Sequence, residues 1–329
     1  MVPQDEYRAI REAAAIGSVA PRRQIAVSGK DRASYLQGLL TNDVAALSAG
    51  TGCYAAWLTA QGRMLTDMHV LESGSMMLLD VPAETLEATI QRLEQFIFTE
   101  DVIVGSLAGS LTGVWLHGPQ AAAVLERAGI AGLATWPNYR HTQSEFESHP
   151  ASVARIDQLG VPGYCVYLEP AYEPPLVAAL TRAGAVVVSA AAIEAARIEA
   201  GYPVYGVDMT DDTIPLEAGI EDRAISMSKG CYVGQEVIIR VLHRGHGRVV
   251  RRLVGLRVDG AVLARGAHLF AGDRDIGFVT SAAESPRLGA IALAYVHRDY
   301  LAAGTKVEAD TGAGRTPATV TERQILSEA

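Results

Sequence analysis

The pattern of apolar residues changes near Arg248, and this change most narrows the folds open to the chain. Beyond Arg248 the sequence consists of short β-like runs, among them VVRRLVGLRV, IGFVTS and IALAYV, which are broken by Gly, Asp and Pro and show no long helical period. Before Arg248, short apolar runs are interleaved with segments of helical spacing. We therefore expect an α+β protein with a C-terminal antiparallel β-barrel or sandwich.

The part of the chain before this boundary contains two successive rounds of sheet and helix. In the first round, Leu86, Ile90, Leu93 and Ile97 fall at spacings of three and four, which predicts a helix with one apolar face over a sheet. The second round repeats strands and helices over a similar length. We place one α+β unit at 1–108, a second at 109–245 and the barrel at 246–329, and the first two units could exchange segments.

Composition and charge exclude several classes of protein. The chain has 329 residues, of which 28 are basic and 37 acidic, so its net charge of −9 argues against general binding of nucleic acids or anionic membranes. It has neither the apolar core of a signal peptide nor a run of about 18 apolar residues that could span a bilayer. We expect a cytoplasmic protein without a membrane segment.

The motifs of several common enzyme classes are absent from the sequence. It contains no GxxxxGK[ST], no complete GxGxxG, no HExxH and no GxSxG, so nucleotide hydrolases, dinucleotide dehydrogenases, zincins and esterases lose their main support. The three cysteines, Cys53, Cys165 and Cys231, are far apart and form no CxxC pair. We expect no disulfide framework and no metal site.

Seven of the 28 Lys and Arg residues lie between Lys229 and Arg257, in a stretch with a single acid, Glu236. Arginine pairs bidentately with carboxylates, so Arg240 and Arg244 could bind a ligand with several carboxylates or a phosphate. The alternative is a solvated edge of a barrel strand, and charge alone favours that alternative.

Cys231 lies two residues after Lys229 within KGCYVGQE. A nearby ammonium lowers the pKa of a thiol and so raises the fraction of reactive thiolate. A structural cysteine is the commoner case, and the local sequence alone favours it.

Two acidic residues occupy unusual positions. Glu199 comes just before Gly201 at the end of a predicted helix, and its carboxylate could accept two hydrogen bonds from the N–C–NH2 edge of a pterin. Asp67 lies inside the predicted strand RMLTDMHV, where a charge must face solvent or a polar cavity. For both residues the local sequence favours exposure to solvent.

Six segments in order give the chain a family resemblance. It resembles the YgfZ family of folate-binding proteins, which are relatives of the glycine-cleavage T-protein, an aminomethyltransferase. The segments that carry the resemblance are SYLQGLLTNDV (34–44), LTAQGRMLTDMHV (58–70), GYCVYLEP (163–170), RIEAGYPVYGVDM (197–209), KGCYVGQEVIIR (229–240) and GFVTSAAESPRLGAIALAYV (277–296).

The resemblance implies a three-domain cloverleaf around a central channel that holds tetrahydrofolate. It makes Glu199 the carboxylate that recognises the pterin, and it adds Arg197 and Tyr164 as further folate contacts. Asp67 matches the second residue of an Asp-Asp pair at the reacting centre of T-proteins, but Thr66 stands in the first position. Asp80-Val81 stands where T-proteins commonly have Ser-Asn, so one folate contact differs.

The KGCYVGQE segment points to the YgfZ side of the family. The resemblance implies an accessory protein for assembly or repair of [4Fe–4S] enzymes, such as tRNA-modifying radical proteins, with iron–sulfur enzymes or assembly proteins as partners. Cys231 would act there as a transient ligand, a redox partner or a thiol beside the folate, with Lys229 as its functional partner. Two alternatives stay open: a folate-dependent aminomethyltransferase that uses Asp67, and a non-catalytic protein-binding scaffold.

Overall fold

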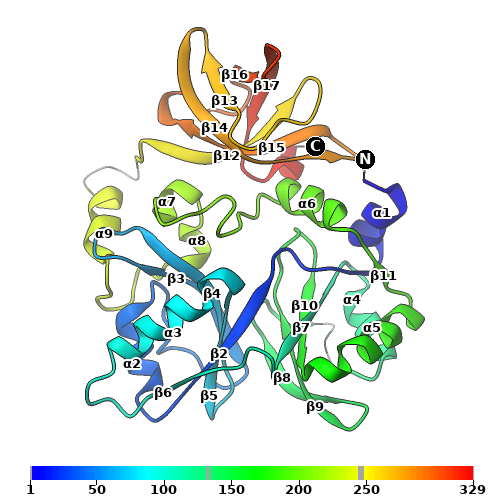
Figure 1. Cartoon of the computed structure of the whole chain (residues 1–329), viewed down its shortest axis with the longest axis vertical. Coiled ribbons are helices and arrows are strands. Elements are labelled where there is room, and N and C mark those ends of the chain that lie inside the picture. Colours follow the sequence, from blue (N-terminus) through cyan, green and yellow to red (C-terminus); the bar gives the residue numbers. More distant parts are fainter. Residues whose placement is uncertain (1, 131–132, 134, 244–247, 329) are drawn as a thin grey trace.

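The computed structural model of the chain describes residues 2–130, 133, 135–243 and 248–328, whose strands form three sheets. Two open sheets lie side by side, and a closed barrel lies beyond one end of both (Figure 1). The predicted α+β class with a C-terminal antiparallel barrel is confirmed.

The first sheet has the strand order β3-β4-β5-β2-β6. Side chains alternate between the two faces of a strand, so Ile25, Val27, Met68, Val70 and Leu79 share one face, where they pack in a core together with residues of the helices α2 and α3. The elements are β2 (Arg22–Ser28), α2 (Arg32–Leu39), β3 (Thr51–Leu58), β4 (Met64–Glu72), β5 (Met76–Pro82), η1 (Ala83–Thr85), α3 (Leu86–Gln95) and β6 (Ile103–Ser106).

The second sheet has the strand order β11-β1-β7-β10-β9-β8. Strand β1 comes from the start of the chain and lies between β7 and β11, so the first 28 residues contribute to both open sheets. The edge strand β8 is largely polar and exposed, which explains why the apolar pattern does not predict it. The elements are α1 (Gln4–Glu12), β1 (Ala15–Ile16), β7 (Thr112–His117), α4 (Ala121–Arg127), β8 (His141–Phe146), β9 (His149–Arg155), β10 (Gly163–Leu168), η2 (Pro170–Tyr172), α5 (Glu173–Arg182) and β11 (Val186–Val187).

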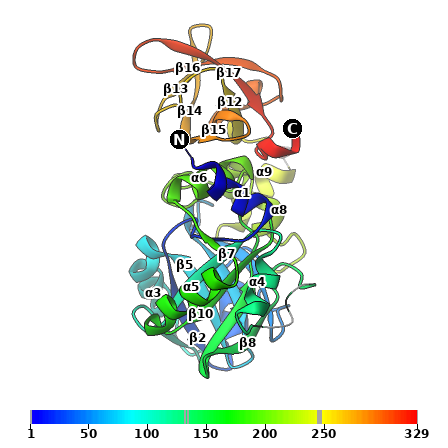
Figure 2. The ribbon, with the colours of Figure 1, turned by 90° about the vertical axis from the view of Figure 1, so that its right-hand side faces the viewer.

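The barrel closes in the order β12-β15-β14-β13-β16-β17 around a core of aliphatic side chains. Helix α6 (Ala190–Glu199) packs against its outer wall through Ile193 and Ala196. Figure 2 shows α1 and α6 beneath the barrel. The elements are β12 (Arg251–Val258), β13 (His268–Ala271), β14 (Arg274–Ser285), β15 (Gly289–His297), η3 (Arg298–Tyr300), β16 (Lys306–Asp310), β17 (Arg315–Thr321) and η4 (Ile325–Glu328).

Three short helices, α7 (Pro215–Ala218), α8 (Glu221–Ala224) and α9 (Gln235–His243), connect α6 to the barrel. The interpretation of the whole basic stretch as the solvated edge of a barrel strand is therefore wrong for Arg240, which lies exposed on α9. Arg251 and Arg257 do lie on a barrel strand, β12, but this strand is paired on both sides and both residues are partly buried. Among the described helices, none is long and apolar enough to cross a membrane.

Candidate functional site

A cluster of buried charges lies on the face of the first sheet that points away from α2 and α3. Across paired strands, Asp80 lies opposite Gln24 on one side and His69 on the other. Arg22 and Asp67 are two residues along from these neighbours, and the period of two puts all five side chains on one face. The sheet register thus gathers two carboxylates and one guanidinium at a single place.

Arg22 bridges the two carboxylates. Its Nη1 donates to Asp67 Oδ1 at 3.1 Å, and its Nε donates to Asp80 Oδ1 at 3.4 Å. Only 3% of Asp67 is exposed, and Asp80 is fully buried. Burial raises the pKa of Asp80, and the charge of Arg22 opposes that rise. The expectation from local sequence that Asp67 faces solvent is wrong, because the second sheet covers this face.

Tyrosine hydroxyls complete the shell of the two carboxylates. Tyr54 donates to Asp67 Oδ2 at 2.7 Å, and Tyr167, from the second sheet, donates to Asp80 Oδ2 at 2.8 Å. Burial, followed by the charge of Asp67, raises the pKa of Tyr54 well above its usual range. The hydroxyl therefore stays protonated and able to donate at neutral pH.

Two polar side chains beside this cluster have buried atoms without a hydrogen-bond partner. Nε and Nη2 of Arg223 lack an acceptor, and its guanidinium lies 4.8 Å from the ring centroid of Tyr54 and 4.1 Å from that of Tyr202. Oε1 of Gln158 lacks a donor, while its Nε2 is 3.3 Å from His69 Nε2. Buried polar atoms in native proteins are nearly always paired, so this place favours a bound water or a polar ligand.

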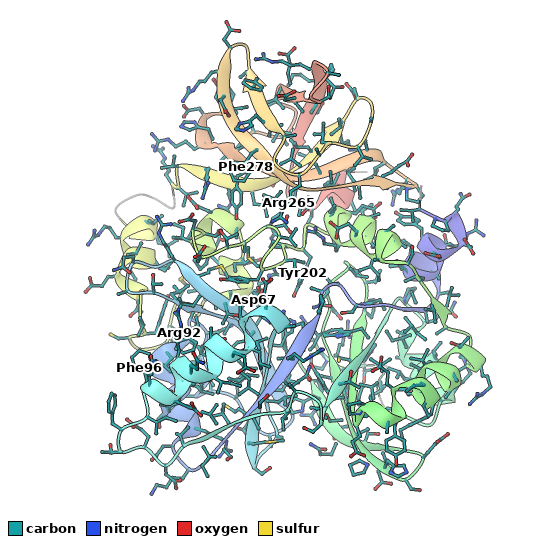
Figure 3. The ribbon with its side chains drawn as sticks, in the orientation of Figure 1. Asp67, Arg92, Phe96, Tyr202, Arg265 and Phe278 are labelled. Carbon is teal, nitrogen blue, oxygen red and sulfur yellow. The ribbon has the colours of Figure 1, made fainter. Side chains whose placement is uncertain are left out.

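A small pocket opens at Asp67. Its volume is about 20 Å³, which is enough for roughly one water molecule. Asp67, on β4, and Tyr202 lie near each other at the centre of the molecule (Figure 3). The pocket is lined in part by Arg22, Asp67, Trp115, Gln158, Tyr202 and Tyr205. As it stands, the pocket does not hold a bicyclic pterin.

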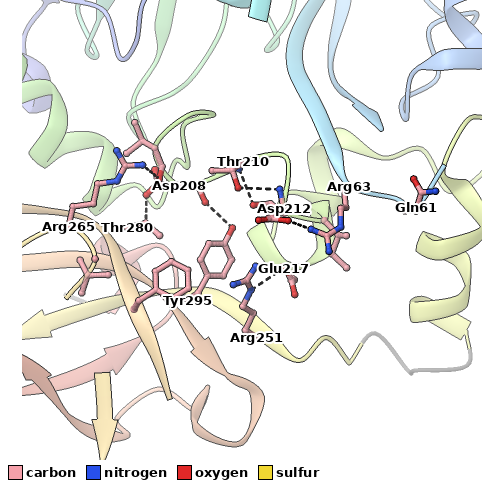
Figure 4. Close-up of a pocket in the computed structure, with 16 residues that line it drawn as sticks. Gln61, Arg63, Asp208, Thr210, Asp212, Glu217, Arg251, Arg265, Thr280 and Tyr295 are labelled. Atoms are coloured by element: carbon pink, nitrogen blue, oxygen red, sulfur yellow. Dashed lines mark hydrogen bonds and ion pairs between the residues drawn. The ribbon is translucent and has the colours of Figure 1, made fainter. Parts of the chain in front are cut away.

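A larger pocket lies between the barrel and the loop that precedes and enters α7. Its volume is about 630 Å³, within the range typical of small-molecule sites. Arg251 lies 4.9 Å from the ring centroid of Tyr295 and 5.6 Å from that of Phe278, and its Nε is 3.4 Å from Glu217 Oε2 (Figure 4). We call it the barrel pocket; its lining combines aromatic rings with three arginines and three acidic residues, which suits a ligand that has both an aromatic ring and polar groups.

Glu199 lies away from both pockets and is fully buried, so the expectation of a solvated carboxylate is wrong. Its Oε2 accepts from Arg11 Nη2 at 2.5 Å and from the hydroxyl of Tyr7 at 2.9 Å, and its Oε1 accepts from Tyr7 and Ser285. A pterin would have to displace these donors. The pterin role of Glu199 stays a prediction.

The other two predicted folate contacts are also buried among protein partners. Arg197 donates to Asp208 at 2.6 Å and to Ser281 at 2.6 Å, which ties α6 to the barrel. The hydroxyl of Tyr164 donates to the carbonyl of Leu133 at 3.2 Å in the core of the second sheet. The structure does not bring Arg197, Tyr164 and Glu199 together, although Asp208, the partner of Arg197, lines the barrel pocket.

The structure separates the side chains of the predicted pair Lys229 and Cys231. Lys229 is 8% exposed and its Nζ donates to backbone carbonyls, whereas Cys231 is exposed. Within the described part of the chain, no three His, Cys, Asp or Glu side chains are grouped as a metal ion would require. Arg240 is exposed on α9, and Arg244 lies outside the described residues.

Arg22, Tyr54 and Arg223 belong to the site although no sequence pattern predicts them. Their partners lie on other strands and helices, so no local spacing signals them. The sequence offers one indication for Arg22: it is a basic residue at the start of a strand, and the strand paired with it contains an internal aspartate, Asp80.

Comparison with known proteins gives a consistent result over nearly the whole chain. Residues 2–229 match the GCVT N-terminal domain, and residues 251–325 match the glycine cleavage T-protein C-terminal barrel domain. A protein named aminomethyltransferase from Rubrobacter xylanophilus is 32% identical over 293 residues, which cover 88% of this chain and 78% of that protein. One with the same name from Synechococcus elongatus is 31% identical over 324 residues, with coverages of 97% and 86%. The crystal structure of glycine cleavage system aminomethyltransferase T from Bartonella henselae aligns with a TM-score of 0.87 at 26% identity and covers 98% of this chain and 88% of that one.

Proposed function

This chain belongs to the glycine cleavage T-protein family, and from that premise we propose that it is a tetrahydrofolate-binding accessory protein of the YgfZ branch. It acts in the cytoplasm on the assembly or repair of [4Fe–4S] enzymes, such as tRNA-modifying radical enzymes. One contrast carries this proposal: the thiol of Cys231 is exposed, while the carboxylate of Asp67 is buried and already held by Arg22 and Tyr54.

The size of the two pockets bears on where the folate would lie. The pocket at Asp67 has room for roughly one water, so a pterin enters it only if residues of its lining move. The barrel pocket has the volume that a folate needs. There, Phe278 and Tyr295 would contact an aromatic ring, and Arg251 and Arg265 would bind the carboxylates of the glutamate tail.

An aminomethyltransferase is the second candidate, because the relatives at about 30% identity carry that name. Such a reaction needs a carboxylate that reaches both the donor and the folate amine. Asp67 is the residue that the family resemblance assigns to this role, and its two oxygens each accept a hydrogen bond from the protein. Opening of the pocket at Asp67 would be required.

Complementation of cells that lack the protein tests the proposal. We expect Cys231→Ser to fold and to bind tetrahydrofolate in calorimetry, but not to restore the activity of [4Fe–4S] enzymes, because a serine hydroxyl cannot replace a thiolate toward iron, sulfide or a disulfide. Ser228→Ala, at a neighbouring exposed position, is the matched control and should restore activity. Full rescue by Cys231→Ser, together with failure of Asp67→Asn, would favour the transferase.

A further inference from the structure

Two segments that lie far apart in the sequence, residues 37–42 and 223–233, meet in the structure. Besides the contacts of Lys229, four hydrogen bonds join the end of α8 and the turn that carries Cys231 to the end of α2 and the loop after it. The backbone N–H of Ser226 donates to the carbonyl of Thr41 at 3.1 Å, and that of Val233 donates to Gly38 at 3.3 Å. The side chains of Thr41 and Asn42 donate back to the carbonyls of residues 224 and 223, at 2.6 and 3.0 Å.

The ammonium of Lys229 lies at the centre of this contact. Its Nζ donates to the carbonyls of Gln37 at 2.7 Å, Leu40 at 2.5 Å and Asn42 at 3.0 Å, so each of its three protons has an acceptor. The first partner is 192 residues away in the sequence. Lys229 therefore has no further donor to offer to another group.

The acceptors lie at the C-terminal end of α2 and just beyond it: Gln37 is in the last turn, Leu40 directly follows the helix, and Asn42 lies in the loop after it, where its carbonyl also accepts from the N–H of Val44. The N–H of Thr41, which would pair with the carbonyl of Gln37 in a longer helix, donates to Ala56 instead. Carbonyls in the last turn of a helix lack intrahelical donors and carry the negative end of the helix dipole, which favours a cation there. Lys229 supplies that cation from a distant part of the chain.

The electrostatic neighbours of this ammonium are Asp43 and Cys53. Burial lowers the pKa of Lys229 to about 8, and the charges of Asp43 and Cys53 oppose that shift. At neutral pH the amine is thus mainly protonated. The neighbouring thiol is that of Cys53, whose pKa burial raises to about 12 despite Lys229.

We propose that Lys229 is a positioning residue, which pins the turn that carries Cys231 to the C-terminal end of α2 and does not itself activate the Cys231 thiol. The functional importance of this position rests on the role of Cys231 proposed above. The pinning itself depends only on the contacts between the two segments.

Two measurements on the same variants test this inference. The first is the pH dependence of alkylation of Cys231 by iodoacetamide, read by peptide mass spectrometry; the second is amide hydrogen exchange at Ser226 and Val233. For Lys229→Met we expect an unchanged pH midpoint of alkylation and exchange at least about tenfold faster, because the local opening of the turn becomes easier. Lys30→Met removes an exposed lysine that lies 3.9 Å from Asp101, and it should change neither readout.

A higher pH midpoint in Lys229→Met, with or without faster exchange, would overturn the proposal in favour of direct activation of the thiol. Unchanged exchange would overturn it as well. Lys229→Arg keeps the charge but not three converging donors, so it should show a smaller gain in exchange, and it provides the comparison if Lys229→Met does not fold. Neither assay uses folate or an iron–sulfur enzyme, so both measurements test the role of Lys229 even if the proposed function is wrong.

Discussion

Glu199 and Asp67 are both buried carboxylates paired with an arginine, yet their surroundings differ. Glu199 receives hydrogen bonds from α1 and from the barrel, and it borders neither of the two pockets considered above. Asp67 borders a pocket and has the unpaired atoms of Arg223 and Gln158 nearby. The first arrangement holds three parts of the chain together, while the second leaves polar groups available to a ligand.

The largest effect is expected from Glu199→Gln. The change removes the counter-charge of Arg11, whose side chain is only 14% exposed, and breaking a largely buried pair in this way costs about 3–5 kcal/mol of the free energy of unfolding. Urea denaturation measures this loss. Glu12→Gln, on the exposed side of α1, is the control and should have almost no effect. Unchanged stability with weaker tetrahydrofolate binding would instead support the pterin role of Glu199 and remove the contrast with Asp67.

A smaller loss is expected from Asp67→Asn, about 1–3 kcal/mol, because Arg22 keeps Asp80 as its counter-charge and Tyr54 can donate to the amide oxygen. The same denaturation experiment measures it, and calorimetry with tetrahydrofolate measures the effect on the ligand. A loss of stability as large as that of Glu199→Gln would show that Asp67 is as much a structural residue as Glu199.

Acid should weaken the folded state through His117, which lies on the Asp67 side of this comparison. His117, stacked on Trp115 beside the Asp67 pocket, has a pKa that burial lowers to about 4. Because the unfolded state takes up a proton near pH 6.5 and the folded state does so only near 4, its contribution is complete above 6.5 and falls by about 1.4 kcal/mol per pH unit between 6.5 and 4. Denaturation of His117→Gln at pH 7 and pH 5 should show a shallower dependence than the wild type. An equal dependence would assign the acid sensitivity elsewhere.

The smallest effect is expected from Arg240→Gln, since the residue is exposed on α9; the free energy of unfolding should stay within about 0.5 kcal/mol of the wild-type value.

If arginines of the barrel pocket bind the glutamate tail of the folate, a polyglutamylated ligand binds more tightly than the monoglutamate, and salt reduces this advantage. Arg251→Gln should remove this advantage while Arg240→Gln keeps it. The reverse result would restore the sequence-based prediction for Arg240.

The sequence predicted the fold better than the site for a physical reason. Strand alternation and helical spacing are local, so the two α+β units and the barrel could be inferred from short windows. For Asp67 the same logic favoured solvent, because an antiparallel sheet commonly has one wet face. Here α2 and α3 cover one face of the first sheet, and Tyr167 reaches the other face from the second. A local pattern carries no information about such a neighbour.

Cys231 and Lys229 show the same limit at a shorter range. Their spacing in the sequence predicts an electrostatic pair. The carbonyls that orient the ammonium instead lie at and after the end of α2, and the first of them, Gln37, is 192 residues before Lys229. Nothing within KGCYVGQE identifies those carbonyls.

Strand β1 has a consequence for the order in which the chain can fold during synthesis. Ala15 pairs with His117 on one side and with Val186 on the other, so the ribosome releases β1 long before either of its neighbours exists. Strand β2, which follows β1 in the sequence, belongs to the first sheet and can pair much earlier, because its partner β5 is synthesised soon after it. We therefore expect β1 to remain unpaired while the first sheet forms. Deletion of β1 should therefore leave the first sheet intact and destabilise the second sheet, in which β1 pairs with β7 and β11.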